Sequence, residues 1–210
     1  MRMGKSSMVI GLAALLAGPV RAEPPPPPRP PELGPARSEA LCGDPGLRGA
    51  PLAAIPGEGG CGVAAPVRLD SAAGVTLEPP ATVACPTARA LLAWLEGTAI
   101  GGFAAAGGEL RTLNVADAYS CRNRNRAASG KLSEHAVGQA IDIGGFGLAD
   151  GRAVTVLAGW DSPDWGAALR RLREGACGPF GTVLGPGSNA LHADHFHFDV
   201  AARRSGPWCE

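Results

Sequence analysis

The chain has 210 residues, of which 19 are basic and 19 acidic, so its formal net charge is zero. Nucleic-acid binding rests on clustered lysine and arginine side chains that neutralise phosphates, and the sequence contains no basic run. An anionic membrane surface is disfavoured for the same reason. We therefore expect neither nucleic acid nor a membrane surface as a partner.

Residues 1–22 have the pattern of a secretory signal peptide. Arg2 and Lys5 precede an apolar run over residues 8–17, and Val20-Arg21-Ala22 supplies residues of the kind that a signal peptidase reads. The run is shorter than the about 20 apolar residues of a membrane-spanning helix, which favours cleavage over an uncleaved anchor. We predict a periplasmic or secreted protein with no stable membrane span after cleavage.

The rest of the chain divides into a spacer and one domain. Residues 23–38 are dense in proline and have little to bury, which predicts an extended tether rather than a proline-rich ligand for a partner. Residues 39–210 are expected to form one domain of ordinary size. Its first part, residues 39–61, is rich in glycine and proline and is expected to be irregular.

Six cysteines lie in this domain: Cys42, Cys61, Cys85, Cys121, Cys177 and Cys209. An even number of cysteines in an oxidising compartment predicts three disulfides. The lack of a C-x-x-C motif argues against a thiolate zinc site and against a thioredoxin-type redox motif. The spacing leaves the connectivity open, with Cys42–Cys61 favoured as a local pair.

Two helices are predicted. The first begins at Cys85-Pro86-Thr87, because proline suits a first helical turn. Its apolar residues recur at helical spacing, at Ala88, Leu91, Leu92 and Leu95. The second begins at Ser162-Pro163, with Ser162 as the N-cap. Its apolar residues are Trp165, Ala168, Leu169 and Leu172.

Short strand-like runs accompany the helices. They occupy residues 113–119, 140–143, 154–157, 182–184 and 196–200. Because these runs do not alternate strictly with the helices, the sequence favours an α+β fold with a mainly antiparallel sheet and flanking helices.

Two motifs contain all four histidines of the chain. In SEHAVGQAIDI, residues 133–143, a histidine precedes a turn and an aspartate lies inside an apolar strand. In HADHFHFD, residues 192–199, strand alternation places His195, His197 and Asp199 on one face and the phenylalanines on the other, toward a core. A face with two imidazoles and a carboxylate is costly to bury unless it lines a site or holds an ion.

His135, Asp142 and one histidine of the second motif would form a set of two imidazoles and a carboxylate. Catalytic zinc takes three ligands of these kinds and keeps a fourth position for water. The ion would also offset the burial of Asp142. The alternative is a group of buried polar residues that pair with one another.

These motifs resemble those of known families. Ser133, His135, Gly138, Ala140 and Asp142 match the S-x-H-x-x-G-x-A-x-D signature of D-alanyl-D-alanine metallopeptidases. The H-x-H at residues 195–197 resembles that of the wider group with lysostaphin-type endopeptidases and hedgehog domains. Over roughly residues 40–209 the chain is most similar to the bacterial extensin-like C-terminal-domain family, through AYSCRNR, LSEHAVGQAIDI, FGTVLGP and HADHFHFD. The resemblance implies a hedgehog/D-Ala-D-Ala-peptidase-like fold.

The resemblance also implies roles for individual residues. It implies Zn²⁺ held by His135, Asp142 and His197, and a substrate-facing Ser133. It implies an arginine beside the scissile carbonyl, which Arg122 matches best. Arg124 and Arg126 are the alternatives.

The general base is expected in the pair Asp194 and His195. Asp194 is favoured because the peptidases have an acidic residue three positions before their last zinc ligand. They usually have glutamate there, and aspartate is one methylene shorter, so His195 is the alternative.

The function that the resemblance implies is zinc-dependent hydrolysis of peptide bonds in peptidoglycan, of the D,D-carboxypeptidase or endopeptidase type. We expect the protein to be a monomer. Two other functions stay open. One is a zinc-containing cell-wall-binding module without catalysis, which the aspartate at position 194 favours. The other is a disulfide-stapled binding domain without metal.

Overall fold

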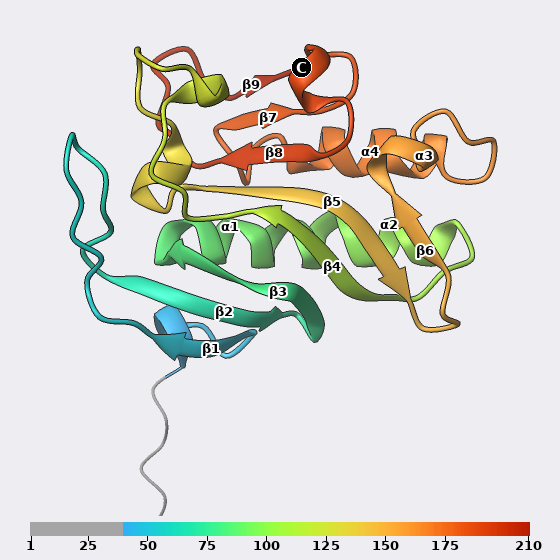
Figure 1. The fold of residues 1–210 in the computed structure, drawn as a ribbon. Coiled ribbons are helices and arrows are strands. Elements are labelled where there is room, and N and C mark those ends of the chain that lie inside the picture. The colour runs from blue at the N-terminus through green and yellow to red at the C-terminus, as the bar shows by residue number, and fades with distance from the viewer. Residues whose placement is uncertain (1–39) are drawn as a thin grey trace, which may run out of the picture. The chain divides into compact units, whose positions relative to one another are not determined.

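The computed structural model describes residues 40–210; the predicted signal peptide and proline-rich tether lie outside the described residues. The strands are β1 (Leu47–Pro51), β2 (Pro66–Ala72), β3 (Val75–Ala84), β4 (Leu110–Asp117), β5 (Ala140–Leu148), β6 (Ala153–Thr155), β7 (Thr182–Leu184), β8 (Phe196–Asp199) and β9 (Trp208–Cys209). They form one sheet in the order β1-β2-β3-β4-β5-β8-β7-β9, with β6 paired to β5 (Figure 1). Within it only β3·β4 and β7·β9 are parallel, so the predicted mainly antiparallel α+β architecture is confirmed.

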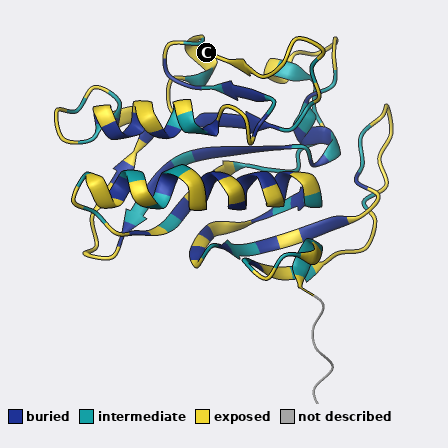
Figure 2. Cartoon of the chain, turned by 180° about the vertical axis from the view of Figure 1, so that it is seen from behind, coloured by how far each residue is buried: buried dark blue, intermediate teal, exposed yellow. Residues whose placement is uncertain are grey.

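Helices cover one face of this sheet. The longer ones are α1 (Cys85–Trp94), continued by a π-helical turn η2 (Leu95–Ala99) and α2 (Ile100–Ala105), and α4 (Gly166–Ala176); α3 (Val156–Gly159) is a single turn. Short 3₁₀ turns are η1 (Leu41–Gly43), η3 (Arg124–Arg126), η4 (Glu134–Val137) and η5 (Ala190–His192). Seen from behind, α1 and α4 lie across the sheet with exposed residues on their outer sides (Figure 2). The apolar residues predicted for the first helix are all buried, which confirms its amphipathic face.

The core between helices and sheet contains the phenylalanines of β8. Phe196 and Phe198 are fully buried, as strand alternation predicts. Trp94 of α1 packs edge-on against Phe198 with 5.1 Å between ring centroids, and its indole N–H donates to the Leu172 carbonyl of α4 at 2.9 Å. Each such side chain contributes roughly 1.5–3 kcal/mol on burial. Because β8 commits its phenylalanines to this core, its histidine and aspartate side chains face the other side of the sheet.

The second helix begins later than predicted. Helix α4 starts at Gly166, and its N-cap is Trp165, without a side-chain cap bond, rather than Ser162. The Ser162 hydroxyl instead accepts a hydrogen bond from the Asp164 amide at 3.2 Å. Such local side-chain to backbone bonds stabilise turns in competition with helix, and here the turn ends only at Gly166.

The first strands of the sheet are absent from the predicted runs. The expectation of irregular chain over residues 39–61 is wrong at β1, which forms an edge strand with only Leu47 buried. The hairpin of β2 and β3 pairs with it and was not predicted. The run over residues 154–157 is only partly strand, because Thr155 ends β6 and its hydroxyl caps α3 by accepting from the Ala158 amide at 3.2 Å.

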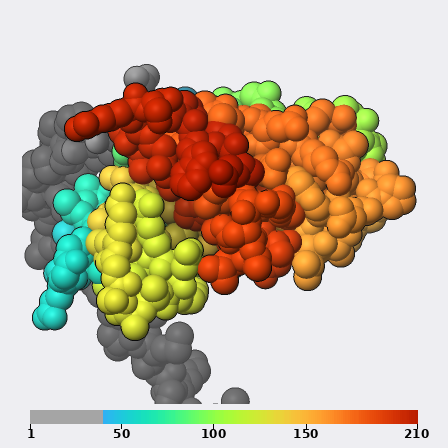
Figure 3. Space-filling model, turned by 90° about the horizontal axis from the view of Figure 1, so that it is seen from above, coloured from blue at the N-terminus to red at the C-terminus, as the bar shows by residue number. Residues whose placement is uncertain are grey.

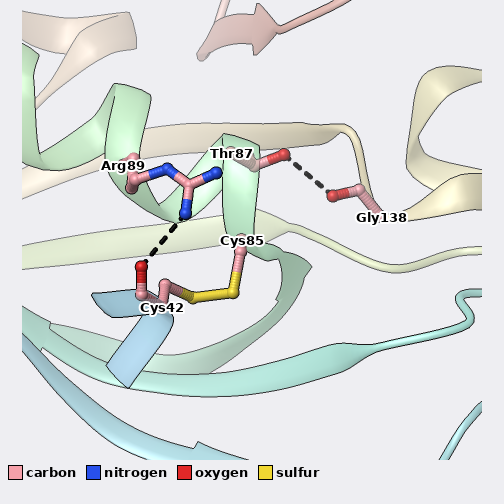
Figure 4. Close-up of a disulfide and its surroundings, with 5 residues drawn as sticks. All are labelled: Cys42, Cys85, Thr87, Arg89 and Gly138. Atoms are coloured by element: carbon pink, nitrogen blue, oxygen red, sulfur yellow. Dashed lines mark hydrogen bonds between the residues drawn. A yellow bond between two sulfur atoms is a disulfide. The ribbon is translucent and has the colours of Figure 1, made fainter. Parts of the chain in front are cut away.

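All six cysteines form disulfides, as predicted, but the favoured pair Cys42–Cys61 is wrong. The bonds are Cys42–Cys85, Cys61–Cys121 and Cys177–Cys209. Cys42 lies beside the start of α1, where the Arg89 guanidinium also donates to its carbonyl at 3.0 Å (Figure 4). These pairings follow tertiary contacts rather than sequence proximity. Three disulfides are typical of proteins that fold in an oxidising compartment.

We expect no reactive thiol when the denatured, unreduced protein is titrated, and peptide mapping should recover the three pairs. Replacing Cys61 and Cys121 together by alanine should lower the free energy of unfolding by about 4 kcal/mol, because their bond closes a long loop in the unfolded chain. Urea unfolding of the double variant measures this loss. Two or more titratable sulfhydryls in the native chain would contradict the pairing.

None of the helices within residues 40–210 has the length and apolar character needed to cross a membrane.

Candidate metal centre

Two of the three predicted ligands face each other across neighbouring strands. Asp142 of β5 and His197 of β8 are directly opposite in the antiparallel register, with the His197 Nδ1 2.8 Å from the Asp142 Oδ1. Their strand neighbours Ile141, Ile143 and Phe196 are buried in the helix-covered core. Because side chains alternate along a strand, Asp142 and His197 lie together on the opposite face.

His135 reaches the same point from the turn that precedes β5. It lies in η4, whose N-cap Ser133 accepts a hydrogen bond from the His135 amide at 3.4 Å. The turn closes at Gly138 with φ +69°, where an added Cβ would come within 3.0 Å of the Ala84 nitrogen. The Thr87 hydroxyl at the start of α1 donates to the Gly138 carbonyl at 2.9 Å (Figure 4). These contacts place the His135 Nε2 3.1 Å from the Asp142 Oδ1 and 3.2 Å from the His197 Nδ1.

Hydrogen bonds on the outer side of each imidazole fix how the ring nitrogens are used. The His135 Nδ1 lies 2.6 Å from the Ala118 carbonyl oxygen, which can only accept, so this nitrogen is protonated. The His197 Nε2 lies 3.3 Å from Oδ2 of the Asp199 carboxylate and donates to it. Outer partners of this kind orient metal-ligating histidines and set their tautomer. In the neutral rings, lone pairs on His135 Nε2 and His197 Nδ1 therefore point at the Asp142 carboxylate.

These three atoms are close enough to one another to share one cation. Three electron-rich atoms within 2.8–3.2 Å of one another repel unless a proton or a metal ion lies between them. Ligand atoms about 2.0–2.2 Å from a shared zinc ion lie about 3.3–3.6 Å apart in tetrahedral geometry. The three atoms are already slightly closer than this, so one small ion is within reach of all three. The donor set predicted from the sequence fits zinc.

The pKa values of these groups reflect the hydrogen bonds between the imidazoles and the carboxylates. Burial alone would lower the pKa of His197, but hydrogen bonds to Asp142 and Asp199 outweigh it and raise this pKa to about 9. Burial would raise the pKa of Asp142, yet hydrogen bonds from His135 and His197 hold it well below its usual range. Asp199 is lowered in the same way, against its burial, chiefly by His197. Without a metal, the His197 Nδ1 therefore carries a proton at neutral pH.

Arg122 borders this cluster and is held in place by a carboxylate. Its guanidinium contacts the Asp117 Oδ2 at 2.9 Å and lies 4.0 Å from the Asp142 Oδ2. Asp117 of β4 is the register partner of Asp142, which explains how the arginine is brought there. Of the alternatives, Arg124 pairs with Glu134, while Arg126 is an exposed second partner of Asp117 at 3.5 Å. Arg122 is thus the arginine closest to the predicted ligands.

The two candidates for the general base differ in exposure and in distance from the predicted ligands. The Asp194 side chain is 65% exposed, and its Oδ1 lies 2.8 Å from the His195 Nδ1. His195 is 17% exposed, and its Nε2 lies 3.6 Å from the Asp142 Oδ2. The carboxylate fixes Nδ1–H as the donor, which leaves Nε2 as an acceptor beside the metal ligands. Of the two side chains, His195 is thus the one beside the predicted ligands, and Asp194 orients its ring from the solvent side.

The cluster lies in a pocket of about 220 Å³. Its walls include all four histidines, four arginines and the carboxylates of Asp142, Asp199 and Glu134. Ser133 also lines it, although its hydroxyl is turned to the His135 amide. Figure 3 shows this face of the domain, where the segment around residues 120–135 (yellow) lies beside the C-terminal segments (orange-red and red).

Several residues that the structure places at this site were given no role in the sequence analysis. Asp199 was placed on the correct face by alternation, and that signal could have identified it as the outer partner of His197. His192 lies 5.3 Å from His195 between ring centroids, and burial, with the charges of His197 and His195, lowers its pKa to about 4. Asp117 carries no sequence signal, because its role depends on the register of β4 with β5.

Comparison with known proteins gives one match. A family model described as the extensin-like protein C-terminus matches residues 41–210. Neither the comparison with curated proteins nor that with solved structures gave a match.

Proposed function

The chain belongs to the extensin-like protein C-terminal family over residues 41–210, and on this premise we propose that it is a zinc-dependent hydrolase of peptide bonds in peptidoglycan. The observation that carries the proposal is the convergence of the His135 Nε2, Asp142 Oδ1 and His197 Nδ1 atoms, with both imidazole tautomers fixed from outside.

The number of ligands supports a catalytic rather than a structural ion. Structural zinc is closed by four protein ligands, whereas catalytic zinc has three and an open position. Among residues 40–210, one group of metal-ligating side chains converges within 4.8 Å, and it has three members. The group borders a pocket rather than the core. A substrate therefore has access to the fourth position.

The side chains around this position can carry out hydrolysis. A bound Zn²⁺ would polarise the scissile carbonyl and acidify a water molecule. The His195 Nε2 would take the proton of the attacking water and later donate it to the leaving amine nitrogen as the C–N bond breaks. Asp194 would stabilise the imidazolium formed in between. Arg122, held by Asp117, would donate hydrogen bonds to the carbonyl oxygen as negative charge develops there.

The proposal also covers the substrate and the location of the protein. The resemblance of both motifs to D-alanyl-D-alanine metallopeptidases supports a wall peptide as the substrate and a hedgehog/D-Ala-D-Ala-peptidase-like arrangement of the fold. The signal-peptide pattern and the three disulfides support a periplasmic or secreted address, where peptidoglycan is found. We further propose that the protein acts as a monomer.

A zinc-containing wall-binding module is the second candidate. The exposure of Asp194 favours it, because the acidic residue expected to act as base does not reach the ligands. Incubating the zinc-loaded protein with purified muropeptides separates the two functions. The hydrolase releases new amino and carboxyl termini, which mass spectrometry detects, whereas the module binds sacculi and releases no product.

Metal binding should be linked to pH through His197. Its pKa of about 9 lies above the ~6.5 of a free histidine. Metal must therefore displace a proton throughout this window, and the apparent affinity should rise about tenfold per pH unit up to pH ~9. Calorimetry in buffers of different ionisation enthalpy should show about one proton released per metal at pH 7.5.

The same raised pKa predicts how the stability of the metal-free protein depends on pH. The contribution of protonated His197 to stability is complete below pH ~6.5 and is lost as the pH rises through about 9.

His192→Gln is the matched control for proton release on metal binding, because the pKa of His192 is lowered to about 4 and this ring is already neutral. An affinity that does not change between pH 6.5 and 8.5 would contradict the linkage.

A further inference from the structure

Arg203 enters the wall of the same pocket from the C-terminal segment. Its guanidinium nitrogens Nε and Nη2 donate to the Thr182 hydroxyl of β7 at 2.9 and 2.6 Å. Its guanidinium carbon lies 5.0 Å from the centroid of the Trp208 ring, a cation–π distance. Trp208 is itself adjacent to the Cys177–Cys209 disulfide, and Arg203 and Trp208 both line the pocket. The guanidinium is thus held on two sides before any ligand binds.

Arg203 differs from the other arginines of the pocket in its partners. Arg122 and Arg126 are paired with Asp117, and Arg124 with Glu134. Within the part of the chain that the structure describes, no carboxylate lies within 4.0 Å of the Arg203 guanidinium. Among residues 40–210, the hydrogen bonds of this guanidinium go to one hydroxyl, which leaves further N–H donors over. Its planar fork matches a carboxylate in two parallel hydrogen bonds.

Arg203 is connected to the predicted metal ligand His197 through Thr182 and Asp199. Thr182, which it contacts, is the register partner of Asp199 across β7 and β8. Asp199 in turn bonds His197. Arg203 therefore lies next to the outer partner of one ligand, whereas Arg122 contacts the cluster through Asp117 and Asp142.

We propose that Arg203, stacked on Trp208, is the anchor for a carboxylate of the substrate. The inference rests on the proposed function, since it assigns the specificity of that site, and it gives Arg203 a binding role and Arg122 a role at the reacting carbonyl. Two sources can supply the carboxylate: the free C-terminus of the peptide, or the α-carboxylate of a γ-linked acidic residue within it. Both would place the anionic part of the peptide on the β7–β9 side of the pocket.

Binding of matched peptide pairs tests the anchor without requiring turnover. The first pair is an acetylated wall peptide ending in D-Ala-D-Ala, as the free acid and as the C-terminal amide. The second pair has an amidated C-terminus and contains D-glutamate or D-isoglutamine. Calorimetry with the His195→Ala protein, as purified, should show that one carboxylate strengthens binding about tenfold over its amide. The pair that discriminates identifies the source.

The variants then assign the effect to Arg203. Arg203→Gln should bring the acid and the amide to within about twofold of each other, and Arg203→Lys should keep part of the preference, since lysine retains the charge but not the fork. Arg204→Gln, at the exposed neighbouring position, should keep all of it. Equal binding of acid and amide in both pairs, or an unchanged preference in Arg203→Gln, would overturn the anchor.

Kinetics with the protein that retains His195 separate this inference from the proposed function. Arg203→Gln should raise KM about tenfold for the discriminating peptide and leave kcat within about twofold, because uniform binding is lost. A fall in kcat with an unchanged KM would overturn the anchor. If the unsubstituted protein cuts no peptide, the proposed hydrolysis fails, whereas the binding preference still decides the role of Arg203.

Discussion

Replacing His197 by alanine is expected to remove zinc and hydrolysis together. The His197 Nδ1 lies 2.8 Å from Asp142 and 3.2 Å from His135, so the variant leaves one imidazole and one carboxylate to hold the ion. Loss of an outer-shell partner typically costs 10–100-fold in metal affinity, and loss of a ligand should exceed about 100-fold. Elemental analysis of the purified variant should find less than a tenth of an equivalent of zinc, against one equivalent in the unsubstituted protein.

His192→Ala is the matched control for this loss. His192 belongs to the same motif, and its ring centroid lies 5.7 Å from that of His197, but its ring bonds Asn189 rather than the ligands. Zinc should stay at one equivalent in this variant. Full zinc retention in His197→Ala would show that the ion is held elsewhere.

Replacing His195 by alanine is expected to remove catalysis and leave the metal. Its Nε2 accepts the proton of the attacking water in the proposed reaction, and loss of a general base typically lowers rates by about 10²–10⁴-fold. Its Nε2 lies 3.6 Å from the Asp142 Oδ2, and His195 is not one of the three converging ligands, so zinc should remain at one equivalent. Muropeptide hydrolysis and zinc content should be measured on the same preparation, so that lost metal is not mistaken for lost chemistry.

Asp194→Asn separates the two members of this pair. If Asp194 orients His195 through the 2.8 Å contact, hydrolysis should fall about tenfold, less than in His195→Ala. A fall of about 10²-fold or more in Asp194→Asn, together with a nearly active His195→Ala, would return the role of base to Asp194. Activity unchanged in both variants would exclude the pair from the reaction.

The sequence predicted the parts of the site that depend on local pattern. Alternation in HADHFHFD places Phe196 and Phe198 in the core and His197 and Asp199 on the opposite face, and the structure confirms both placements. The spacing in SEHAVGQAIDI likewise brings His135 back over Asp142, because the turn at Gly138 reverses the chain within a few residues.

Features that depend on register or on long-range contacts were not predicted. Asp117 holds Arg122 only because β4 pairs with β5 in the register that sets Asp117 opposite Asp142. Sequence distance favoured a Cys42–Cys61 bond, whereas the start of α1 brings Cys85 to Cys42. The expectation that Asp194 is the base rests on its position in a motif, whereas the exposure of its side chain and its contact with His195 depend on the local backbone.

The most direct test of the account is to titrate zinc into the chelator-treated, metal-free protein while muropeptide cleavage is followed. We predict no cleavage without zinc, a rate that rises in proportion to added zinc up to one equivalent, and a plateau beyond it. The His195→Ala protein should take up the same equivalent and remain inactive. Cleavage that does not depend on added zinc, or no cleavage at one bound equivalent, would contradict a zinc-dependent hydrolase.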